Sequence, residues 1–141
     1  MEKEIRATAL VIFQDKILVI HRHRNGEEYF LLPGGSVEEN ETTEKAVTRE
    51  LFEETSITGE LGKKIYSCID KYNKEHQVFL VEYKFGEPKL QPDSVEVART
   101  LKDSTNTYDP KWIKKSIIKD LVFRPVGMKE FLLSYFDIMR I

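Results

Sequence analysis

Apolar residues gather in short runs of strand length, separated by polar or turn-forming residues. Residues 7–13 (ATALVIF) form one continuous run, and residues 17–20 (ILVI) follow after the polar break Gln14-Asp15-Lys16. The β-branched residues of these runs favour strands, and the short break predicts a hairpin. After Asn25-Gly26, a strong turn dipeptide, residues 29–32 (YFLL) predict a further strand.

The next segment predicts a glycine loop that leads into a helix. Pro33-Gly34-Gly35 ends the strand, because proline cannot donate to a ladder and glycine permits tight or positive-φ backbone. Thr42 is a plausible N-cap, and residues 43–55 contain neither glycine nor proline. Val47 and Leu51 lie four residues apart, so they share a face that packs inward.

The second half of the chain alternates between strand-like and loop-like segments before a last helix. Residues 65–69 and 78–83 predict paired strands, and residues 106–110 are rich in turn formers and precede a short strand at Trp112-Ile113. Pro125 fits the first turn of a helix. Apolar residues at helical spacing follow it and predict core packing: Met128, Phe131, Leu132, Tyr135, Phe136 and Met139.

Strands with one helix between them and one at the end predict an α/β (α+β) sandwich with a mixed sheet. The 141 residues fit one domain, 1–141, and 40% hydrophobic with 33% charged residues is ordinary for a folded protein. The net charge of −2 argues against long nucleic acid as a partner.

Several features favour a cytoplasmic protein. Residues 1–4 are charged and have no apolar signal core behind them, and no apolar run reaches the roughly 18 residues of a membrane span. The chain has one cysteine, Cys68, which suits a reducing compartment. We therefore expect no membrane partner.

Three glutamates carry the candidate chemistry. Glu50, Glu53 and Glu54 stand at i, i+3 and i+4, so on a helix their carboxylates share one face. Like charges this close repel, and either Arg49 or a hard divalent cation such as Mg²⁺ can compensate them. A solvated acidic face is the alternative interpretation, since surface glutamates are common.

The spacing around these glutamates favours a functional site. A pattern of this length arises by chance about 10⁻⁸ times per window, given residue frequencies of a few per cent. The pattern resembles the Nudix box, except that Ser56 stands where the family usually has glycine, and serine in a left-handed cap costs about 1 kcal/mol. The pattern runs Gly35, five residues, Glu41, seven residues, Arg49-Glu50-Leu51, one residue, Glu53-Glu54, two residues, Ile57.

The resemblance implies a three-layer α/β/α sandwich and a pyrophosphohydrolase that cleaves a nucleoside diphosphate linked to another group. It implies Mg²⁺ or Mn²⁺ as cofactor, with Glu50, Glu53, Glu54 and the Gly34 carbonyl as metal ligands. Arg49 and Glu41 resemble the pair that orients the helix. Glu50 or Glu53 would help activate water, with Arg49 as part of the catalytic group.

The resemblance places Arg22 and Gly35 on the substrate side, and Glu96 with Arg99 resembles a recurring Glu-x-x-Arg. A nucleoside triphosphate, damaged or intact, is the first substrate expected. Dinucleoside polyphosphates and nucleotide sugars are the alternative substrates. A non-catalytic nucleotide-binding module and an acidic protein-interaction domain are the alternative functions. The identity of the general base, the number of metals and a homodimer stay open.

Overall fold

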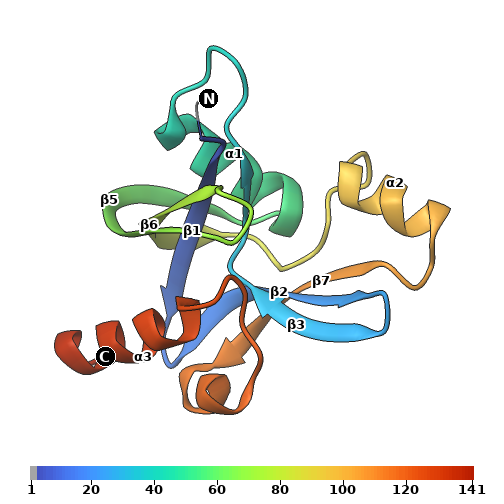
Figure 1. Cartoon of the computed structure of the whole chain (residues 1–141). Coiled ribbons are helices and arrows are strands. Elements are labelled where there is room, and N and C mark those ends of the chain that lie inside the picture. The colour runs from blue at the N-terminus through green and yellow to red at the C-terminus, as the bar shows by residue number, and fades with distance from the viewer. Residues whose placement is uncertain (1–2) are drawn as a thin grey trace.

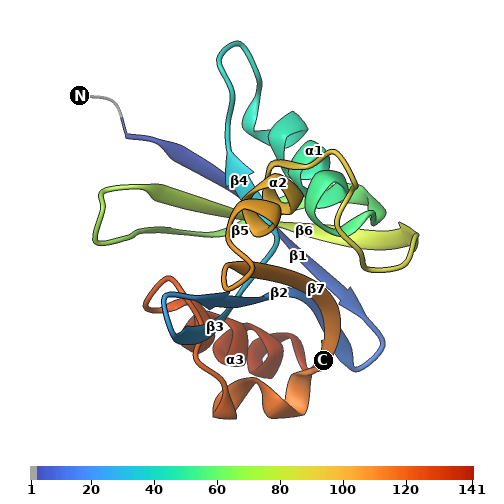
Figure 2. The same cartoon turned by 90° about the vertical axis from the view of Figure 1, so that its right-hand side faces the viewer.

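A mixed sheet flanked by helices forms the chain (Figures 1 and 2). The computed structural model describes residues 3–141, so the first two residues of the charged N-terminus lie outside the described part. The elements are β1 (Ile5–Phe13), β2 (Lys16–Arg24), β3 (Glu27–Leu31), β4 (Gly34–Ser36), α1 (Thr43–Thr55), β5 (Thr58–Ile69), β6 (Glu75–Phe85), α2 (Val95–Lys102), β7 (Thr107–Lys114), the 3₁₀ helix η1 (Lys115–Asp120) and α3 (Met128–Met139).

The sheet has seven strands, and its main path runs β3-β2-β1-β6-β5. Strand β4 pairs with β1, and β7 pairs with β2. The β1–β6 pair is parallel, whereas β1–β2, β2–β3, β2–β7 and β5–β6 are antiparallel. The mixed sheet and the α/β sandwich expected from the sequence are therefore confirmed.

Two apolar cores lie on opposite sides of β1, which explains why its sequence is apolar without alternation. Leu10 belongs to the core that includes Leu132 and Phe136 of α3. Its neighbour Val11 belongs to the other core, which includes Leu51 of α1. Because successive strand residues point to opposite faces, a strand covered by helices on both sides needs apolar residues at every position.

Strand β1 changes partners along its length, and this places the glycine segment next to α1. Its end pairs with β2 at Ile12 and Phe13, and its start pairs with β4, where Thr8 is opposite Gly34. The expectation of a loop at Gly34-Gly35 was wrong, since both residues lie in β4 and neither has positive φ. Glycine is required at position 34 by close approach, because a Cβ there would lie 2.5 Å from the Ala7 carbonyl oxygen.

The second half departs from expectation in three places. Residues 107–114 form one strand, β7, although residues 106–110 were expected to be a turn. Pro110 is tolerated because β7 pairs with β2 alone, so its missing N–H can face outward. Helix α2 was not expected, because none of its side chains is buried and it has no core stripe. The last helix begins at Met128 after an N-cap at Gly127, so Pro125 precedes it.

No helix formed by residues 3–141 is long and apolar enough to cross a membrane.

Candidate active site

Helix α1 carries the glutamate face and begins and ends where its sequence predicts. The Thr42 side chain accepts a hydrogen bond from the Lys45 amide at 3.2 Å, which satisfies one of the free N–H groups of the first turn. At the other end Ser56 adopts the left-handed conformation, with φ 62° and ψ 12°, and its amide donates to the Phe52 carbonyl. The expected cap position is thus occupied by serine in the conformation that usually favours glycine.

The Ser56 hydroxyl takes part in contacts that a glycine could not make. It donates to the Lys89 carbonyl at 2.6 Å and accepts from Gln91 Nε2 at 2.6 Å. Two backbone bonds reinforce the contact, from the Lys89 amide to Thr55 and from the Gln91 amide to Glu53. The end of α1 therefore fixes the segment that leads into α2.

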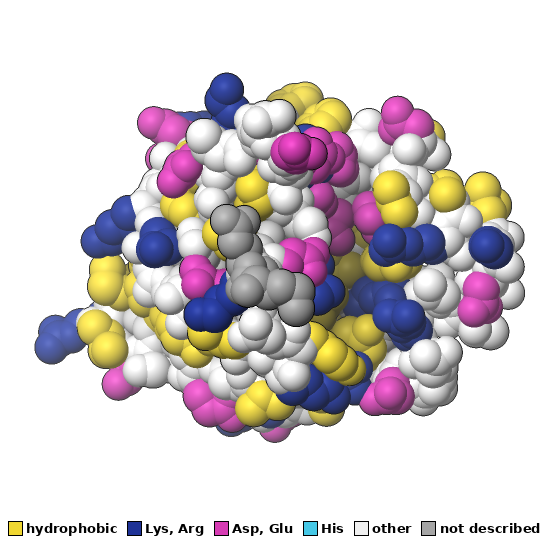
Figure 3. Space-filling model, turned by 45° about the horizontal axis from the view of Figure 1, so that its top comes forward, with side chains coloured by type: hydrophobic (Ala, Val, Ile, Leu, Met, Phe, Trp, Pro, Cys, Tyr) yellow, Lys and Arg dark blue, Asp and Glu magenta, His cyan; other side chains and the backbone are white. Residues whose placement is uncertain are grey.

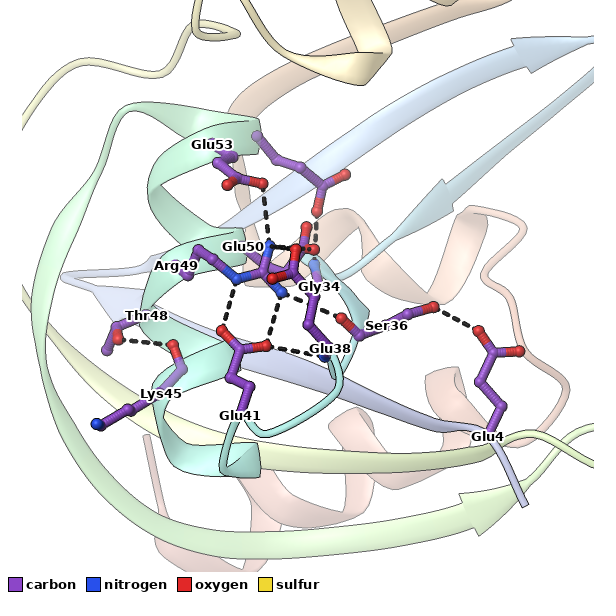
Figure 4. Close-up of polar contacts among 11 residues, drawn as sticks. Glu4, Gly34, Ser36, Glu38, Glu41, Lys45, Thr48, Arg49, Glu50 and Glu53 are labelled. Atoms are coloured by element: carbon purple, nitrogen blue, oxygen red, sulfur yellow. Dashed lines mark hydrogen bonds and ion pairs between the residues drawn. The ribbon is translucent and has the colours of Figure 1, made fainter. Parts of the chain in front are cut away.

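Arg49 is the centre of the polar network at the site (Figure 4). Its Nε and Nη2 donate to the two carboxylate oxygens of Glu41 at 2.6 and 2.9 Å, and Nη2 also donates to the Ser36 carbonyl at 3.1 Å. On its other side Nη1 donates to Glu50 at 2.9 Å and to Glu53 at 3.2 Å. One guanidinium thus joins β4, the following loop and the glutamate face of α1.

The glutamates of the network have opposite pKa shifts. Hydrogen bonds from Arg49 lower the pKa of Glu41 to about 2. Burial raises the pKa of Glu50, although Arg49 opposes this and the charges of Glu53 and Glu96 add to it. Burial raises the pKa of Glu54 well above its ordinary value of 4.5, with the charges of Glu96 and Glu50 adding to the shift. The negative charges of Glu50 and Glu54, which share one face of α1, are therefore only partly compensated by the protein's own cations.

The glycines of β4 let the chain approach these carboxylates. The Gly34 amide donates to Glu54 Oε1 at 2.7 Å. A Cβ on Gly35 would lie 2.6 Å from Glu50 Oε1 and still closer to the other carboxyl atoms. Any side chain at position 35 would therefore displace Glu50, and this contact explains the glycine that begins the sequence pattern.

Arg22 lies in a second cluster, on β2 beside β7. It is only 3% exposed, and its Nη1 donates to the Thr107 carbonyl at 2.9 Å. Its guanidinium lies 3.6 Å from the centre of the Tyr108 ring, and the Tyr108 hydroxyl accepts from Arg99 at 3.2 Å. No hydrogen bond of residues 3–141 joins this stack to Arg49, although the charges of Glu96 and Glu54 act on Arg99.

Comparison with known proteins decides the family. The model of the NUDIX domain matches residues 3–120. The chain belongs to the Nudix family. A curated relative, an ADP-ribose pyrophosphatase of Methanocaldococcus jannaschii, is 36% identical over 112 residues, which cover 75% of this chain and 65% of that protein. The chain thus spans slightly less than two thirds of the relative's length.

Solved structures show the same Nudix fold at low sequence identity. The ORF135 protein of E. coli has a TM-score of 0.69 and 19% identity, covering 99% of this chain and 92% of that one. A NUDIX family hydrolase of Clostridium perfringens has a TM-score of 0.71 and 15% identity, covering 98% and 99%. The expected family and fold are therefore confirmed.

The donor set of the Nudix helix fits a hard divalent cation. Glu50, Glu53 and Glu54 offer oxygen atoms only, and Mg²⁺ and Mn²⁺ prefer oxygen ligands. The raised pKa values of Glu50 and Glu54 show that this face favours additional positive charge. Arg49 holds Glu50 and Glu53, whereas the Gly34 amide holds Glu54. In residues 3–141, the ligating atoms of these three carboxylates do not all lie within 4.8 Å of one another.

Acidic and basic side chains face one another across a hollow of the surface. Figure 3 shows acidic side chains gathered on one wall of the hollow and Lys or Arg side chains on the other. A small pocket beside Gly34 is lined by Arg6 and Arg124, among others, and the charge of Arg6 lowers the pKa of Glu54. We did not expect either arginine from the sequence, because neither belongs to the box pattern, and Arg124 is ion-paired with Glu27.

Proposed function

We propose that this Nudix protein is a metal-dependent hydrolase that cleaves a phosphoanhydride bond in a small nucleoside diphosphate-linked molecule. One observation carries the proposal. Glu50 and Glu54 are held on one helix face with raised pKa values, although Arg49 and the Gly34 amide already donate to them. Burying such a pair is costly unless cations compensate it, which is the condition that a metal–diphosphate complex meets.

The box residues divide into ligands and positioning groups. We propose that Glu50, Glu53, Glu54 and the Gly34 carbonyl hold Mg²⁺ or Mn²⁺. Such a cation neutralises phosphate charge and lowers the pKa of water, which makes hydrolysis of a stable diphosphate accessible. Glu50 or Glu53 accepts the proton of the attacking water.

Arg49 and Glu41 keep the ligands in place. The two bonds between them fix the guanidinium plane, so Nη1 remains directed at Glu50 and Glu53. Arg49 therefore acts chiefly by orienting the catalytic carboxylates. The planar guanidinium of arginine suits this role better than the single ammonium group of lysine.

We propose that the substrate enters from the side of Gly35 and of Arg22. The absent side chain at Gly35 leaves room beside Glu50. Arg22 is nearly buried and stacked on Tyr108, so we propose that it acts as a fixed positive charge beneath the substrate and that Tyr108 presents its ring. Phosphates and a nucleobase would find a charge and an aromatic surface there.

Two kinds of substrate within this class are candidates. The sequence pattern led us to expect a nucleoside triphosphate first. The similarity to an ADP-ribose pyrophosphatase favours a nucleoside diphosphate joined to a sugar. Both candidate substrates would bind the same carboxylate face, and they differ only in the group beyond the diphosphate.

A hydrolysis screen with product identification tests the proposal. Nucleoside triphosphates, dinucleoside polyphosphates and ADP-sugars are incubated with the chain and Mg²⁺, and phosphate, pyrophosphate and nucleotide products are quantified. We expect turnover in at least one class, loss of turnover with a chelator and recovery when metal is restored. Nucleotide binding without turnover in any class would identify a non-catalytic binding module, and turnover in excess chelator would exclude the metal mechanism.

A further inference from the structure

Two histidines of β2 and a glutamate of β3 bring their ligating atoms together away from the active site. His21 and His23 are two residues apart on one strand, so they share a face, and Arg22 between them points to the other. Glu28 is directly opposite His23 in the β2–β3 register. The ligating atoms of His21, His23 and Glu28 all lie within 4.8 Å of one another.

The face of the hairpin distinguishes this cluster from the Nudix site. Arg22 stacks on Tyr108 on one side of β2, whereas the His21 ring stacks on Phe30, which belongs to the core beneath α3. The hairpin of β2 and β3 projects from the body of the molecule beside β7 (Figure 1). An ion bound by the histidines would therefore be separated from the glutamate face of α1 by the sheet.

The interatomic distances are close to those of a metal centre. Glu28 Oε2 lies 2.7 Å from His21 Nε2 and 3.2 Å from His23 Nε2. Zinc binds imidazole nitrogen and carboxylate oxygen at about 2.0–2.2 Å, so neighbouring ligands of a tetrahedral site lie roughly 3.3 Å apart. Both measured separations reach this value with a small movement of the exposed Glu28 side chain.

Both imidazole rings are held by neighbours that do not compete for Nε2. The His21 and Phe30 rings are stacked, with centroids 4.3 Å apart and an interplanar angle of 9°. His23 Nδ1 lies 3.4 Å from Thr107 Oγ1 on β7. Histidine ligands of metals usually donate their other ring N–H to an oxygen, which fixes the tautomer. In a metal-bound form, His23 would donate its Nδ1–H to Thr107 and use Nε2, which lies beside Glu28, as its ligand atom.

We propose that His21, His23 and Glu28 form a binding site for one divalent transition metal ion of the Zn²⁺ class, with a fourth coordination position open to water. Imidazole ligands suit Zn²⁺, Ni²⁺ and Cu²⁺, whereas Mg²⁺ and Ca²⁺ prefer all-oxygen sites. The two sites of the chain therefore select different ions. The ion would link β2 to β3, and Thr107 of β7 would orient the His23 ligand.

Calorimetry with Zn²⁺ tests the site directly. The full chain, free of any polyhistidine tag, is titrated with Zn²⁺ in excess Mg²⁺, which occupies the oxygen ligands of α1. We expect uptake of one equivalent, abolished by His23→Gln or Glu28→Gln and retained by the matched control His76→Gln. Both variants alter half-exposed or exposed surface side chains, and their Mg²⁺-dependent hydrolysis should equal that of the wild type.

Absence of Zn²⁺ uptake, or equal uptake by wild type, His23→Gln and Glu28→Gln, would show that the cluster is only a set of contacts between histidine and glutamate side chains. Failure of nucleotide hydrolysis would leave this result unaffected, since the titration measures binding alone. The two proposals can therefore fail separately.

Histidine NMR gives a second measurement that needs no variant. The chain has three histidines. Zn²⁺ should shift the ring signals of His21 and His23 and leave those of His76, which is bound to Asp70, unchanged. Shifts at His76 alone, or at none of the three, would overturn the assignment.

A graded variant tests the part played by β7. Thr107→Val keeps the β-branched shape of the side chain but removes the oxygen near His23 Nδ1. Loss of such an outer partner typically weakens metal affinity by about 10–100-fold. We expect weaker but measurable Zn²⁺ binding, and affinity equal to that of the wild type would exclude a role for Thr107.

Discussion

At the residue scale, single contacts with the Glu50 carboxylate determine the geometry of the proposed active site. Arg49 donates to Glu50 on one side, and Gly35 leaves the space that the carboxyl group occupies on the other. The Glu50 side chain is largely buried and its pKa is raised, so specific neighbours must stabilise its charge. Small changes at either neighbour should therefore alter chemistry more than stability.

Glu50→Gln should separate chemistry from folding. The amide keeps the size of the side chain, but it is a poor Mg²⁺ ligand and accepts no proton from water. Turnover should fall by about 10²-fold or more, and the melting temperature should hold or rise slightly as repulsion with Glu53 and Glu54 is relieved. Turnover and melting curves of this variant are compared with those of Glu44→Gln, an exposed glutamate of the same helix. Turnover within threefold of wild type would exclude Glu50 as a catalytic ligand.

Gly35→Ala should disturb catalysis through a single methyl group. The backbone of Gly35 does not have positive φ, so alanine is not strained there, but its Cβ would overlap the Glu50 carboxyl group. We expect a substantial loss of turnover together with weaker Mg²⁺ activation. Gly26→Asn, at an open turn position with φ 77°, is the matched control because asparagine tolerates that conformation. Equal turnover in both variants would show that Glu50 moves without consequence.

At the element scale, the end of α1 and the segment leading to α2 behave as one unit. Ser56 ends the helix in the left-handed conformation, and its hydroxyl bonds to both Lys89 and Gln91. The local cost of serine in this conformation is about 1 kcal/mol. The tertiary hydrogen bonds offset this cost, which explains how serine can occupy a conformation that usually favours glycine.

Variants at position 56 should separate the backbone strain of Ser56 from the hydrogen bonds of its hydroxyl. Ser56→Ala keeps the backbone strain and loses both hydroxyl bonds, so the free energy of unfolding should fall by about 1–2 kcal/mol. Ser56→Gly loses the same bonds but relieves the strain, so its stability should lie between alanine and wild type. Chemical denaturation of the three proteins measures the order. Alanine as stable as serine would show that the hydroxyl bonds contribute nothing.

At the scale of the whole molecule, two cores hold the sheet, and the Arg49 network connects the sheet to α1. Leu132 and Phe136 cover one face and Val47 and Leu51 the other. Between β4 and α1, the junction is polar and depends on the charge of Glu41. Acid should therefore weaken this junction before it affects the apolar cores.

The pH dependence of stability should report the charge of Glu41. Its pKa of about 2 in the folded protein lies below the ordinary 4.5, so its contribution is complete above about pH 4.5 and is lost as pH falls toward 2. Glu41→Gln lacks this contribution at every pH. The difference in melting temperature between wild type and variant should thus be largest near neutrality and shrink below pH 4.5. The exposed Glu39→Gln should show no such trend, and a pH-independent difference would contradict the assignment.

The fold was predictable from the sequence where a local pattern coincided with a buried face. The bounds of α1 followed from Thr42 and from the run without glycine or proline. Strands β1 and β2 followed from their apolar runs, although both are longer than expected. Helix α2 and the full length of β7 were not predictable, because α2 buries no side chain and the residues that begin β7 are also turn formers.

The sequence by itself determined the family and the set of candidate ligands, because the box residues are fixed by spacing along one helix and its preceding loop. Only the tertiary structure decided how those residues are compensated. Arg49 donates hydrogen bonds to both Glu41 and Glu50, and Gly35 leaves room for the Glu50 carboxyl group. Strand β4 brings the Gly34 amide within hydrogen-bond distance of Glu54. Pairing between strands likewise brought His21 and His23 next to Glu28. Such contacts depend on register and on burial, which arise only when distant segments pack together, so no spacing along the chain encodes them.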